Sequence, residues 1–300
     1  MKFTVIIPTY NREKDLQELL NSIFQQTFLP DEIIIIDDGE LDENFLEKIR
    51  IYFENYAIKL IYYRKDHTRE RKGSSESRNI GVNLSHNEII FILDDDLKLD
   101  FNFFQKIIEL WAKNKNDEKL IGIGGWITNI RRQTSFEKVY NKIFGISSKN
   151  LWDVNEVGFQ VWDMDIKEPL KGFYIHGGVS SYKKSLLKKM GGFETFQGGR
   201  TALEDVEFCL RAKKMKYFFI ITPYAKAIHK QSIIGREDQF KTGFKEGHNR
   251  KIIFKKHCKQ DLFHKIWFWW ANIGWILRQF LSGHFSKGIG MIKGLFNSLE

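Results

Sequence analysis

The sequence predicts an α/β protein with a mostly parallel, doubly wound sheet and a helical appendage at its C-terminal end. Over residues 1–110, Ile-rich apolar runs alternate with segments of helical periodicity. The runs are continuous, as in strands that helices cover on both faces. The appendage is indicated by charge, because residues 241–300 hold eleven Lys or Arg and three Asp or Glu. This segment therefore contributes +8 to the net charge of +9, which suits an anionic surface.

Each element of the first half follows from its own pattern. Strands are predicted over residues 3–8, 32–36, 58–63 and in the run 88–96. Helices are predicted over residues 13–26, 42–55 and 77–85, with a mobile loop over 64–76. Further strands are predicted over residues 119–127 and 217–222, and residues 134–175 are aromatic-rich and irregular. We expect residues 1–235 to form the main domain, divided near residue 110, and residues 236–300 to form the appendage.

Several classes of protein are disfavoured. With two cysteines, Cys209 and Cys258, the chain has neither a disulfide framework nor a cysteine metal motif, and it fits a reducing compartment. The opening MKFTVIIPTY is better explained as a strand than as a secretory signal. The sequence holds neither GxGxxG after the first strand nor GxxxxGK[ST], so it supports neither dinucleotide-type nor P-loop phosphate binding.

Three carboxylates end the fourth strand, where residues 88–96 read EIIFILDDD. Ligands of open α/β sheets bind beyond the carboxyl ends of the strands. Because side chains alternate along a strand, Asp94 and Asp96 can share one side while Asp95 points away. Two convergent carboxylates suit a hard divalent cation such as Mg²⁺ or Mn²⁺. A solvated acidic turn is the alternative interpretation.

The first two strands also end in polar side chains. The first strand ends at Pro8 and is followed by Thr9, Tyr10 and Asn11, and the second is followed by Asp37 and Asp38. Carboxylates at these positions would repel a bare phosphate, but they can accept hydrogen bonds from a base or a ribose. These residues, together with Asp94 and Asp95, form the predicted ligand-binding set at this edge of the sheet.

Three segments in this order resemble family 2 glycosyltransferases with the GT-A fold. They are VIIPTYNREKDLQELLNSIFQQTFLPDEIIIIDDG, SSESRNIGVNLSHNEIIFILDDD, and GGVSSYKKSLLKKMGGFE followed by EDVEFCLR. The resemblance covers roughly residues 3–230. It implies a nucleotide-sugar donor, a divalent cation (Mn²⁺ or Mg²⁺) and inversion at the anomeric carbon.

On the donor side, the resemblance implies that Thr9 and Asn11 line the nucleotide pocket and that Asp38 accepts from a uracil-type base. Arg78 would lie near the donor, with a surface arginine as the alternative. The family's D-x-D motif falls on Asp94 and Asp96, and Asp96 would be the direct metal ligand. The Asp at the middle position, Asp95, departs from the commoner pattern. His229 would be a third protein ligand, although a lone histidine is more often structural.

On the acceptor side, the resemblance implies that Asp205 deprotonates the acceptor hydroxyl, with Glu204 close to the acceptor. From the residues alone, Glu204 has another explanation: Thr201-Ala-Leu-Glu204 fits a capping box. The dipole of a helix that begins there would favour the ionised form of Asp205. Gly177 and Gly178 would allow close backbone approach on the acceptor side.

The appendage is rich in tryptophan, with four of the eight tryptophans within residues 262–281. Its apolar stretch is shorter than the ~20 residues that span a bilayer. Tryptophans among basic residues favour a helix in the membrane interface, and residues 286–299 can form a second one. Packing on the main domain, or oligomerisation through these helices, is the alternative. Nucleic acid is not an expected partner, since no recognised binding module is present.

Together these observations predict a metal-dependent, inverting glycosyltransferase, peripheral on the cytoplasmic face of the cell membrane. Its donor would be a nucleotide sugar, most simply a UDP-sugar, and its acceptor a lipid-linked glycan or polysaccharide. A nucleotidyltransferase on the same type of sheet is one alternative. An inactive glycan-binding or membrane-adaptor protein is another, against which the intact carboxylates argue.

Overall fold

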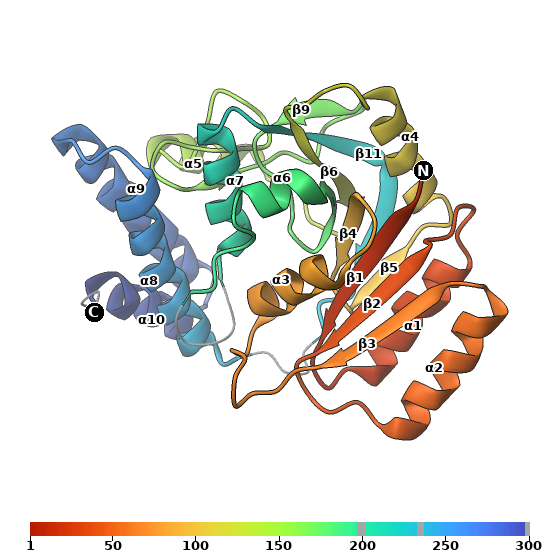
Figure 1. Ribbon diagram of the computed structural model, residues 1–300. Helices are drawn as coiled ribbons and strands as arrows, with labels where there is room; N and C mark the ends of the chain where they lie inside the picture. Colours follow the sequence, from red (N-terminus) through yellow and green to blue (C-terminus); the bar gives the residue numbers. More distant parts are fainter. Residues whose placement is uncertain (197–201, 233–236, 298–300) are drawn as a thin grey trace.

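The computed structural model describes residues 1–196, 202–232 and 237–297. A nine-stranded sheet has the order β3-β2-β1-β4-β10-β6-β11-β5, with β9 beside β11 (Figure 1). Its strands are β1 (Phe3–Thr9), β2 (Glu32–Asp37), β3 (Lys59–Arg64), β4 (Ile89–Leu93), β5 (Leu97–Leu99), β6 (Leu120–Ile127), β9 (Leu170–Gly172), β10 (Val179–Lys183) and β11 (Phe218–His229). A small second sheet pairs β7 (Asp153–Val154) with β8 (Gln160–Val161).

The helices cover both faces of the large sheet and form the C-terminal part. They are α1 (Glu13–Phe24), α2 (Glu43–Asn55), α3 (Ser74–Leu84), α4 (Phe103–Lys113), α5 (Ser135–Ile143), α6 (Lys184–Lys189), α7 (Glu204–Lys214), α8 (Gln239–His257), α9 (Leu262–Leu281) and α10 (Phe285–Phe296). The predicted α/β class with a helical appendage is confirmed.

The sheet is mostly parallel, as predicted. Strands β1 to β4 run parallel to one another, and β11 runs parallel to β6. Strand β10 lies antiparallel between β4 and β6, and β5 and β9 lie antiparallel to β11. Strands β4, β6 and β11 therefore keep the common direction, and their carboxyl ends fall at the same edge of the sheet.

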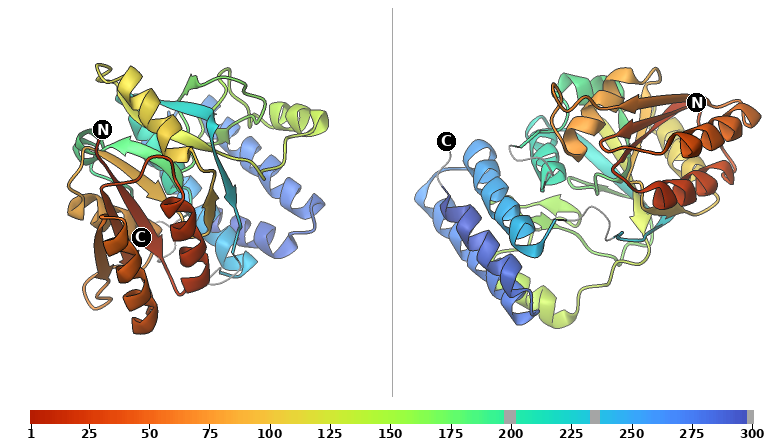
Figure 2. Two further views of the ribbon diagram at one scale, coloured as in Figure 1. Left: turned by 90° about the vertical axis from the view of Figure 1, so that its right-hand side faces the viewer. Right: turned by 90° about the horizontal axis from the view of Figure 1, so that it is seen from below.

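Alternation along the buried strands sorts their side chains into two cores. Val5 and Ile7 of β1 join the core beneath α1, α2 and α4, whereas Ile6 faces the opposite core with α3, α6 and α7 (Figure 2). Helix α3 lies close to β1, since a Cβ added at Gly81 would be 2.3 Å from Ile6 Cγ2. These two layers hold the carboxyl edge of the sheet in a fixed geometry.

Several predicted boundaries are wrong. Helix α1 ends at Phe24, and α3 begins at Ser74, which shortens the loop predicted over 64–76. Strand β11 continues to His229 instead of ending near residue 222, because its second half pairs with β5 after a register shift. The histidine therefore lies in the sheet and not in a segment after it.

The segment predicted to be irregular contains ordered elements, and the clearest is α5. Thr134 caps this helix: its side chain accepts from the Glu137 N–H, and the Glu137 carboxylate accepts from the Thr134 N–H at 2.8 Å. This is a capping box, the motif that Thr201-Ala-Leu-Glu204 also fits. The sequence Thr134-Ser-Phe-Glu137 carries the same signal.

Helices α8 and α10 cross with their backbones in contact. Each has two glycines four residues apart, Gly243 and Gly247 in α8 and Gly290 and Gly294 in α10. A Cβ at Gly290 would lie 2.2 Å from the Phe240 carbonyl oxygen, and one at Gly294 would meet the next turn of α8 at a similar distance. Small residues at this spacing allow two helices to approach closely.

The C-terminal helices also pack on the segment that holds α5. The Trp267 indole donates to the Gly145 carbonyl at 2.8 Å, and the Tyr140 hydroxyl donates to the Gly274 carbonyl at 2.7 Å. The guanidinium of the fully buried Arg250 donates to the Gly158 carbonyl and lies 3.9 Å from the centre of the Phe159 ring. Among the described residues, no helix combines the length and apolar character needed to cross a bilayer.

We predict that Gly290→Ala destabilises the protein, although alanine favours helix formation. The added methyl group must push α10 away from α8, and overpacking of this kind typically costs about 1–3 kcal/mol. Thermal unfolding should therefore show a melting temperature several degrees lower. Ser286→Ala, at an exposed position of the same helix, is the matched control and should leave it unchanged. An unchanged melting temperature for Gly290→Ala would contradict the close contact.

Candidate active site

The candidate site lies at the carboxyl edge of the sheet, where β1, β2, β4 and β11 end. Asp94, Asp95 and Asp96 form the turn between β4 and β5. The antiparallel pairing of β5 with β11 sets Leu97 opposite His229. The histidine therefore lies beside Asp96, although 132 positions separate the two residues in the sequence.

Asp94, Asp96 and His229 form a group that could hold a metal ion. One ligand atom from each residue lies within 4.8 Å of the others. Asp96 is buried, and its Oδ1 is 2.9 Å from His229 Nε2. Burial raises the pKa of Asp96, but the interactions with His229, the Ser232 N–H and Arg12 lower it more, so that the pKa lies below its ordinary value. The carboxylate is therefore ionised at neutral pH, as a metal ligand must be.

Asp95 points away from this group, as the alternation along the strand predicted. Its two oxygens accept from the Thr9 hydroxyl at 2.8 Å and from Arg12 Nη1 at 2.9 Å. The same guanidinium nitrogen lies 3.7 Å from Asp96 Oδ2. Burial raises the pKa of Asp95 to about 6 despite these partners. Asp95 thus connects the turn after β4 to the turn after β1.

Arg78 of α3 connects the acidic turn to a second pair of carboxylates. Its guanidinium is almost fully buried and donates to Asp94 Oδ1 at 3.1 Å and to Glu204 Oε1 at 2.9 Å. Burial alone would lower the pKa of this group, but the two carboxylates raise it. The alternative that Arg78 is a surface arginine is wrong.

Glu204 and Asp205 occupy the first turn of α7. The helix begins at Glu204 itself, after Leu203 in a left-handed conformation, and Leu203 provides no side-chain cap. The Glu204 carboxylate pairs with Arg78; the predicted capping box also requires Thr201, which lies outside the described residues. Burial raises the pKa of both carboxyl groups above their ordinary values.

The Asp205 carboxylate is held by a tyrosine. The Tyr174 hydroxyl donates to Asp205 Oδ2 at 2.9 Å, and Asp205 Oδ1 accepts from the Val206 N–H at 2.8 Å. The buried Tyr174 and the half-buried His176 both pack against Trp152. Burial lowers the pKa of His176 to about 4, so this ring is neutral at physiological pH. One oriented carboxylate thus lies in a largely aromatic setting.

Gly177 and Gly178 lie against the acidic turn. The Asp94 N–H donates to the Gly178 carbonyl at 2.8 Å, and a Cβ at Gly178 would be 2.0 Å from Asp94 Oδ2. A Cβ at Gly177 would be 3.0 Å from Arg78 Nη1. Any side chain at Gly178 would therefore displace Asp94.

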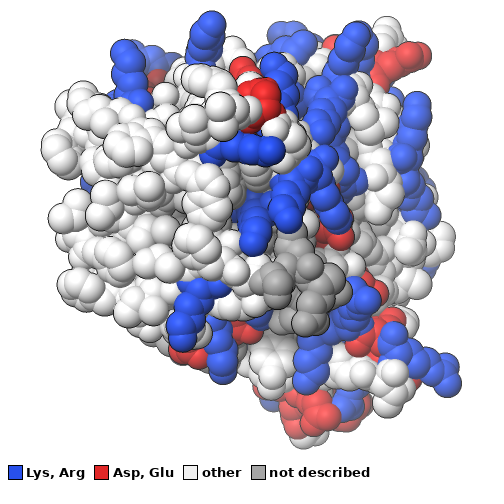
Figure 3. Space-filling model, turned by 90° about the vertical axis from the view of Figure 1, so that its left-hand side faces the viewer, with Lys and Arg blue, Asp and Glu red and all other residues white. Residues whose placement is uncertain are grey.

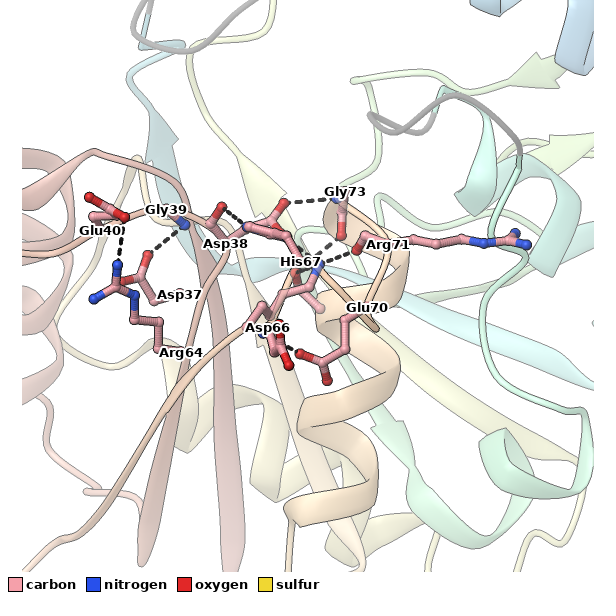
Figure 4. A network of polar contacts seen from close by, with 12 residues as sticks. Asp37, Asp38, Gly39, Glu40, Arg64, Asp66, His67, Glu70, Arg71 and Gly73 are labelled. Carbon is pink, nitrogen blue, oxygen red and sulfur yellow. Dashed lines mark hydrogen bonds and ion pairs between the residues drawn. The ribbon is translucent and has the colours of Figure 1, made fainter.

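Asp37, the last residue of β2, and Asp38, which follows it, have different surroundings (Figure 4). The buried Asp37 carboxylate accepts from the backbone N–H groups of Gly39 and Leu41 and from the Tyr62 hydroxyl, which fixes the turn. Asp38 lies 2.6 Å from the Lys65 ammonium and accepts from the Gly73 N–H at 2.8 Å. Asp37 therefore supports the turn, whereas Asp38 connects the end of β2 to the segment before α3.

The other residues predicted for the donor side lie on the turn after β1. Asn11 has φ of 51°, and its side chain accepts from the Glu40 N–H at 2.9 Å. Pro8 is half-buried at the end of the strand, and the Tyr10 ring is exposed beside it. These residues line the same edge as Asp38 and Asp94.

Sequence reasoning missed Arg12, Lys65 and Tyr174. Arg12 stands directly after the Thr9-Tyr10-Asn11 turn, so its position was a usable signal. Lys65 follows β3 in the same manner, at the carboxyl end of a parallel strand. For Tyr174, nothing local indicates the contact with Asp205, which depends on the packing of α7 against the segment between β9 and β10.

The chain is similar to known glycosyltransferases. Residues 4–190 match the family model for glycosyl transferase family 2. Glycosyltransferase GlyA of Streptococcus pneumoniae is 29% identical over 52% of this chain and 22% of its own length. The O-antigen chain rhamnosyltransferase RfbN of Salmonella typhimurium is 24% identical over 98% of this chain and 80% of its own. The chain spans less than two thirds of the length of several curated relatives that it matches.

Solved structures share the fold. S. aureus TarS 1-349 in complex with UDP-GlcNAc aligns with a TM-score of 0.61 at 17% identity, over 98% of this chain and 80% of that one. The mannosyltransferase PcManGT from Pyrobaculum calidifontis, in complex with GDP-Man and Mn²⁺, aligns with a TM-score of 0.58 at 16% identity, over 98% and 79%. The predicted GT-A fold is thereby confirmed. The family match favours a glycosyltransferase over a nucleotidyltransferase.

We predict that Mn²⁺ raises the melting temperature of the wild-type protein, because an ion that binds the native state stabilises it by mass action. Asp96→Ala and His229→Ala should lose most of this shift. Asp95→Asn is the matched control and should keep it, since this carboxylate faces Arg12. The shift should weaken as the pH falls, because protons compete for the ligands. A full Mn²⁺ shift in Asp96→Ala would contradict the assignment.

Proposed function

Because this chain belongs to glycosyl transferase family 2, we propose that it transfers a sugar from a nucleotide-diphosphate donor to a hydroxyl group of a glycan or lipid-linked glycan. One observation carries the proposal: Arg78 joins the turn of Asp94 and Asp96 to the half-buried pair Glu204 and Asp205 within a single site. The first group suits the diphosphate of a donor, and the second suits deprotonation of an acceptor.

For the donor we propose a uridine-diphosphate sugar. The nucleotide would lie over the ends of β1 and β2, with Asp38 accepting from the imide N–H of uracil. The ionic contact with Lys65 orients Asp38 for this hydrogen bond. The UDP-GlcNAc complex of TarS supports the choice of nucleotide, whereas PcManGT binds GDP-Man.

Asp94, Asp96 and His229 would hold a divalent cation. Two carboxylates suit Mg²⁺ or Mn²⁺, and the imidazole nitrogen favours Mn²⁺ of the two. When bound, such an ion neutralises charge on the diphosphate leaving group as a Lewis acid. Arg12 lies beside Asp95 and Asp96 and limits their repulsion before donor binds.

Asp205 would act as the general base. Its carboxylate takes the proton of the acceptor hydroxyl while the acceptor oxygen forms a bond to the anomeric carbon. The bond from that carbon to the diphosphate oxygen breaks, and the oxygen leaves with the electron pair. Attack opposite the leaving group inverts the configuration. Tyr174 orients the base through its hydrogen bond, and Arg78 holds Glu204 beside it.

We predict that Asp205→Asn loses transfer by a factor on the order of 10² or more while keeping donor binding. The substitution preserves size and removes basicity. Rates from product formation and affinities from calorimetry with UDP separate the two effects. Glu207→Gln on the same helix is the control, because this carboxylate faces Arg211. Normal transfer by Asp205→Asn together with a dead Glu204→Gln would assign the base to Glu204.

The pH dependence provides a second measurement on the same residue. Because burial raises the pKa of Asp205, the base is lost at higher pH than for an exposed aspartate, and the rate should fall as pH falls through that pKa. The folded state also binds this proton more tightly than the unfolded state. The free energy of unfolding therefore decreases as the pH rises through the raised pKa and Asp205 ionises. Asp205→Asn should remove this decrease.

We also predict that UDP binds more tightly than GDP and that Asp38→Ala weakens UDP binding. Loss of a hydrogen bond to a charged group typically costs about 1.5–3 kcal/mol, which is roughly a 10- to 150-fold rise in the dissociation constant. Calorimetry with both nucleotides tests this. Glu40→Ala, an exposed neighbour, is the control. Tighter binding of GDP would overturn the choice of uracil.

A further inference from the structure

The outward side of α9 displays apolar side chains along its whole length. They recur at three- and four-residue intervals, so they form one row: Leu262, Ile266, Trp269, Ile273, Leu277 and Leu281. Leu281, at the end of the row, is 77% exposed. A row of this kind normally faces a protein core, and here it faces outward.

The side of α9 that faces the protein is mixed: Phe268 and Ala271 pack in a small core with α8 and α10, and polar side chains are buried beside them. His264, Asn272 and Gln279 all lie against the rest of the protein, and Asn272 is fully buried. Packing on the protein therefore accounts for Phe268 and Ala271 but not for the outward row. The helix thus has two apolar sides, whereas a helix whose apolar stripe only covers its own domain has one.

Two neighbouring helices repeat the pattern. In α10 the exposed row is Phe285, Ile289, Ile292 and Phe296. In α5 the exposed row is Phe136, Val139 and Ile143. We call the outward rows of α5, α9 and α10 the outer apolar face.

Direct contacts make the three rows continuous. The Trp270 indole donates to the Ile143 carbonyl at 2.8 Å, and the Trp270 and Phe144 rings stack with centres 4.9 Å apart, which joins α9 to α5. The Trp269 and Phe296 rings stack at 5.3 Å, which joins α9 to α10. Figure 3 shows this side of the molecule, where a broad area without charged residues borders a band of Lys and Arg. A continuous apolar face of this kind marks an interaction surface.

The charge of the segment favours an anionic partner. Residues 262–297 contain Lys265, Arg278, Lys287 and Lys293 and neither Asp nor Glu. Arg278 and Lys287 pair with Glu137 and Glu246, whereas Lys265 and Lys293 are exposed. In a symmetric dimer the exposed lysines of the two copies would face each other, and residues 262–297 offer no acidic side chain to pair with them. Exposed tryptophans beside basic residues suit the headgroup boundary of a bilayer.

We propose that the outer apolar face docks on the surface of a lipid bilayer that contains anionic lipids. Helices α5, α9 and α10 lie in the plane of the interface, with their apolar rows in the region between headgroups and acyl chains. Lys265 and Lys293 contact the lipid phosphates. The face is built from three helices, so it includes α5, which ends more than a hundred residues before α9 begins.

The test is co-sedimentation of the full chain with vesicles of phosphatidylcholine, alone or with roughly one third phosphatidylglycerol. The wild type should bind the anionic vesicles more tightly. Raising the salt from about 0.1 M to about 1 M, which shortens the screening length from ~10 Å to ~3 Å, should weaken binding without abolishing it. Lys265→Gln and Lys293→Gln should each weaken binding about fivefold. Wild type that stays in the supernatant with anionic vesicles at low salt would overturn the proposal.

Ile273→Asp and Val139→Asp test the rows of α9 and α5, and each should release the protein from the vesicles. Ile51→Asp is the matched control, since Ile51 is an equally exposed aliphatic side chain on α2, away from the outer apolar face. It should bind as the wild type does. Circular dichroism and melting temperature should be unchanged in all three variants, because the positions are exposed. If Ile273→Asp abolishes a dimer seen by sedimentation equilibrium and leaves vesicle binding unaltered, a second copy covers the face and the lipid proposal is wrong.

Discussion

The carboxyl edge of the sheet depends on a balance of charge. Five carboxylates gather there, from Asp94, Asp95, Asp96, Glu204 and Asp205; Asp95 and Asp96 are buried and the other three are half-buried. Two arginines oppose them: Arg12 from the turn after β1 and Arg78 from α3. A buried charge without a partner is strongly destabilising, whereas a paired one is tolerated. The positions of α3 and α7 relative to the sheet are therefore fixed by the same ionic contacts that arrange the site.

Much of this could be predicted from the sequence because the signals are local. The Ile-rich runs indicate buried strands, the two-residue period separates Asp95 from its neighbours, and strand ends meet at one edge in a parallel sheet. The boundaries of β11 and α7 could not be predicted, since they follow from pairing and packing between distant segments. Tyr174 is the clearest case, because its contact with Asp205 joins the irregular segment between β9 and β10 to the first turn of α7. The capping signal was ambiguous, since both Thr134 and Thr201 fit it.

The C-terminal helices are connected to the site through α8. His257 Nε2 of α8 lies 2.9 Å from Glu207 Oε1 of α7, the helix that begins with Glu204 and Asp205. The Asn249 side chain donates to the Ala202 carbonyl at 2.9 Å, just before that helix. The glycines of α8 in turn place it against α10. One helix thus contacts both the segment of the candidate base and a helix of the outer apolar face.

The antiparallel strand β10 has a consequence for how the protein is made. It lies between β4 and β6, so the strand that ends in the acidic turn has one open edge until residues 179–183 leave the ribosome. Glu204 and His229 are synthesised later still. Until residues 179–183 emerge, the nascent chain exposes the Ile-rich edge of β4, which is a template for pairing with other chains. Such distant pairings slow folding and favour aggregation. Correct production of this chain therefore depends on protection of β4 during synthesis.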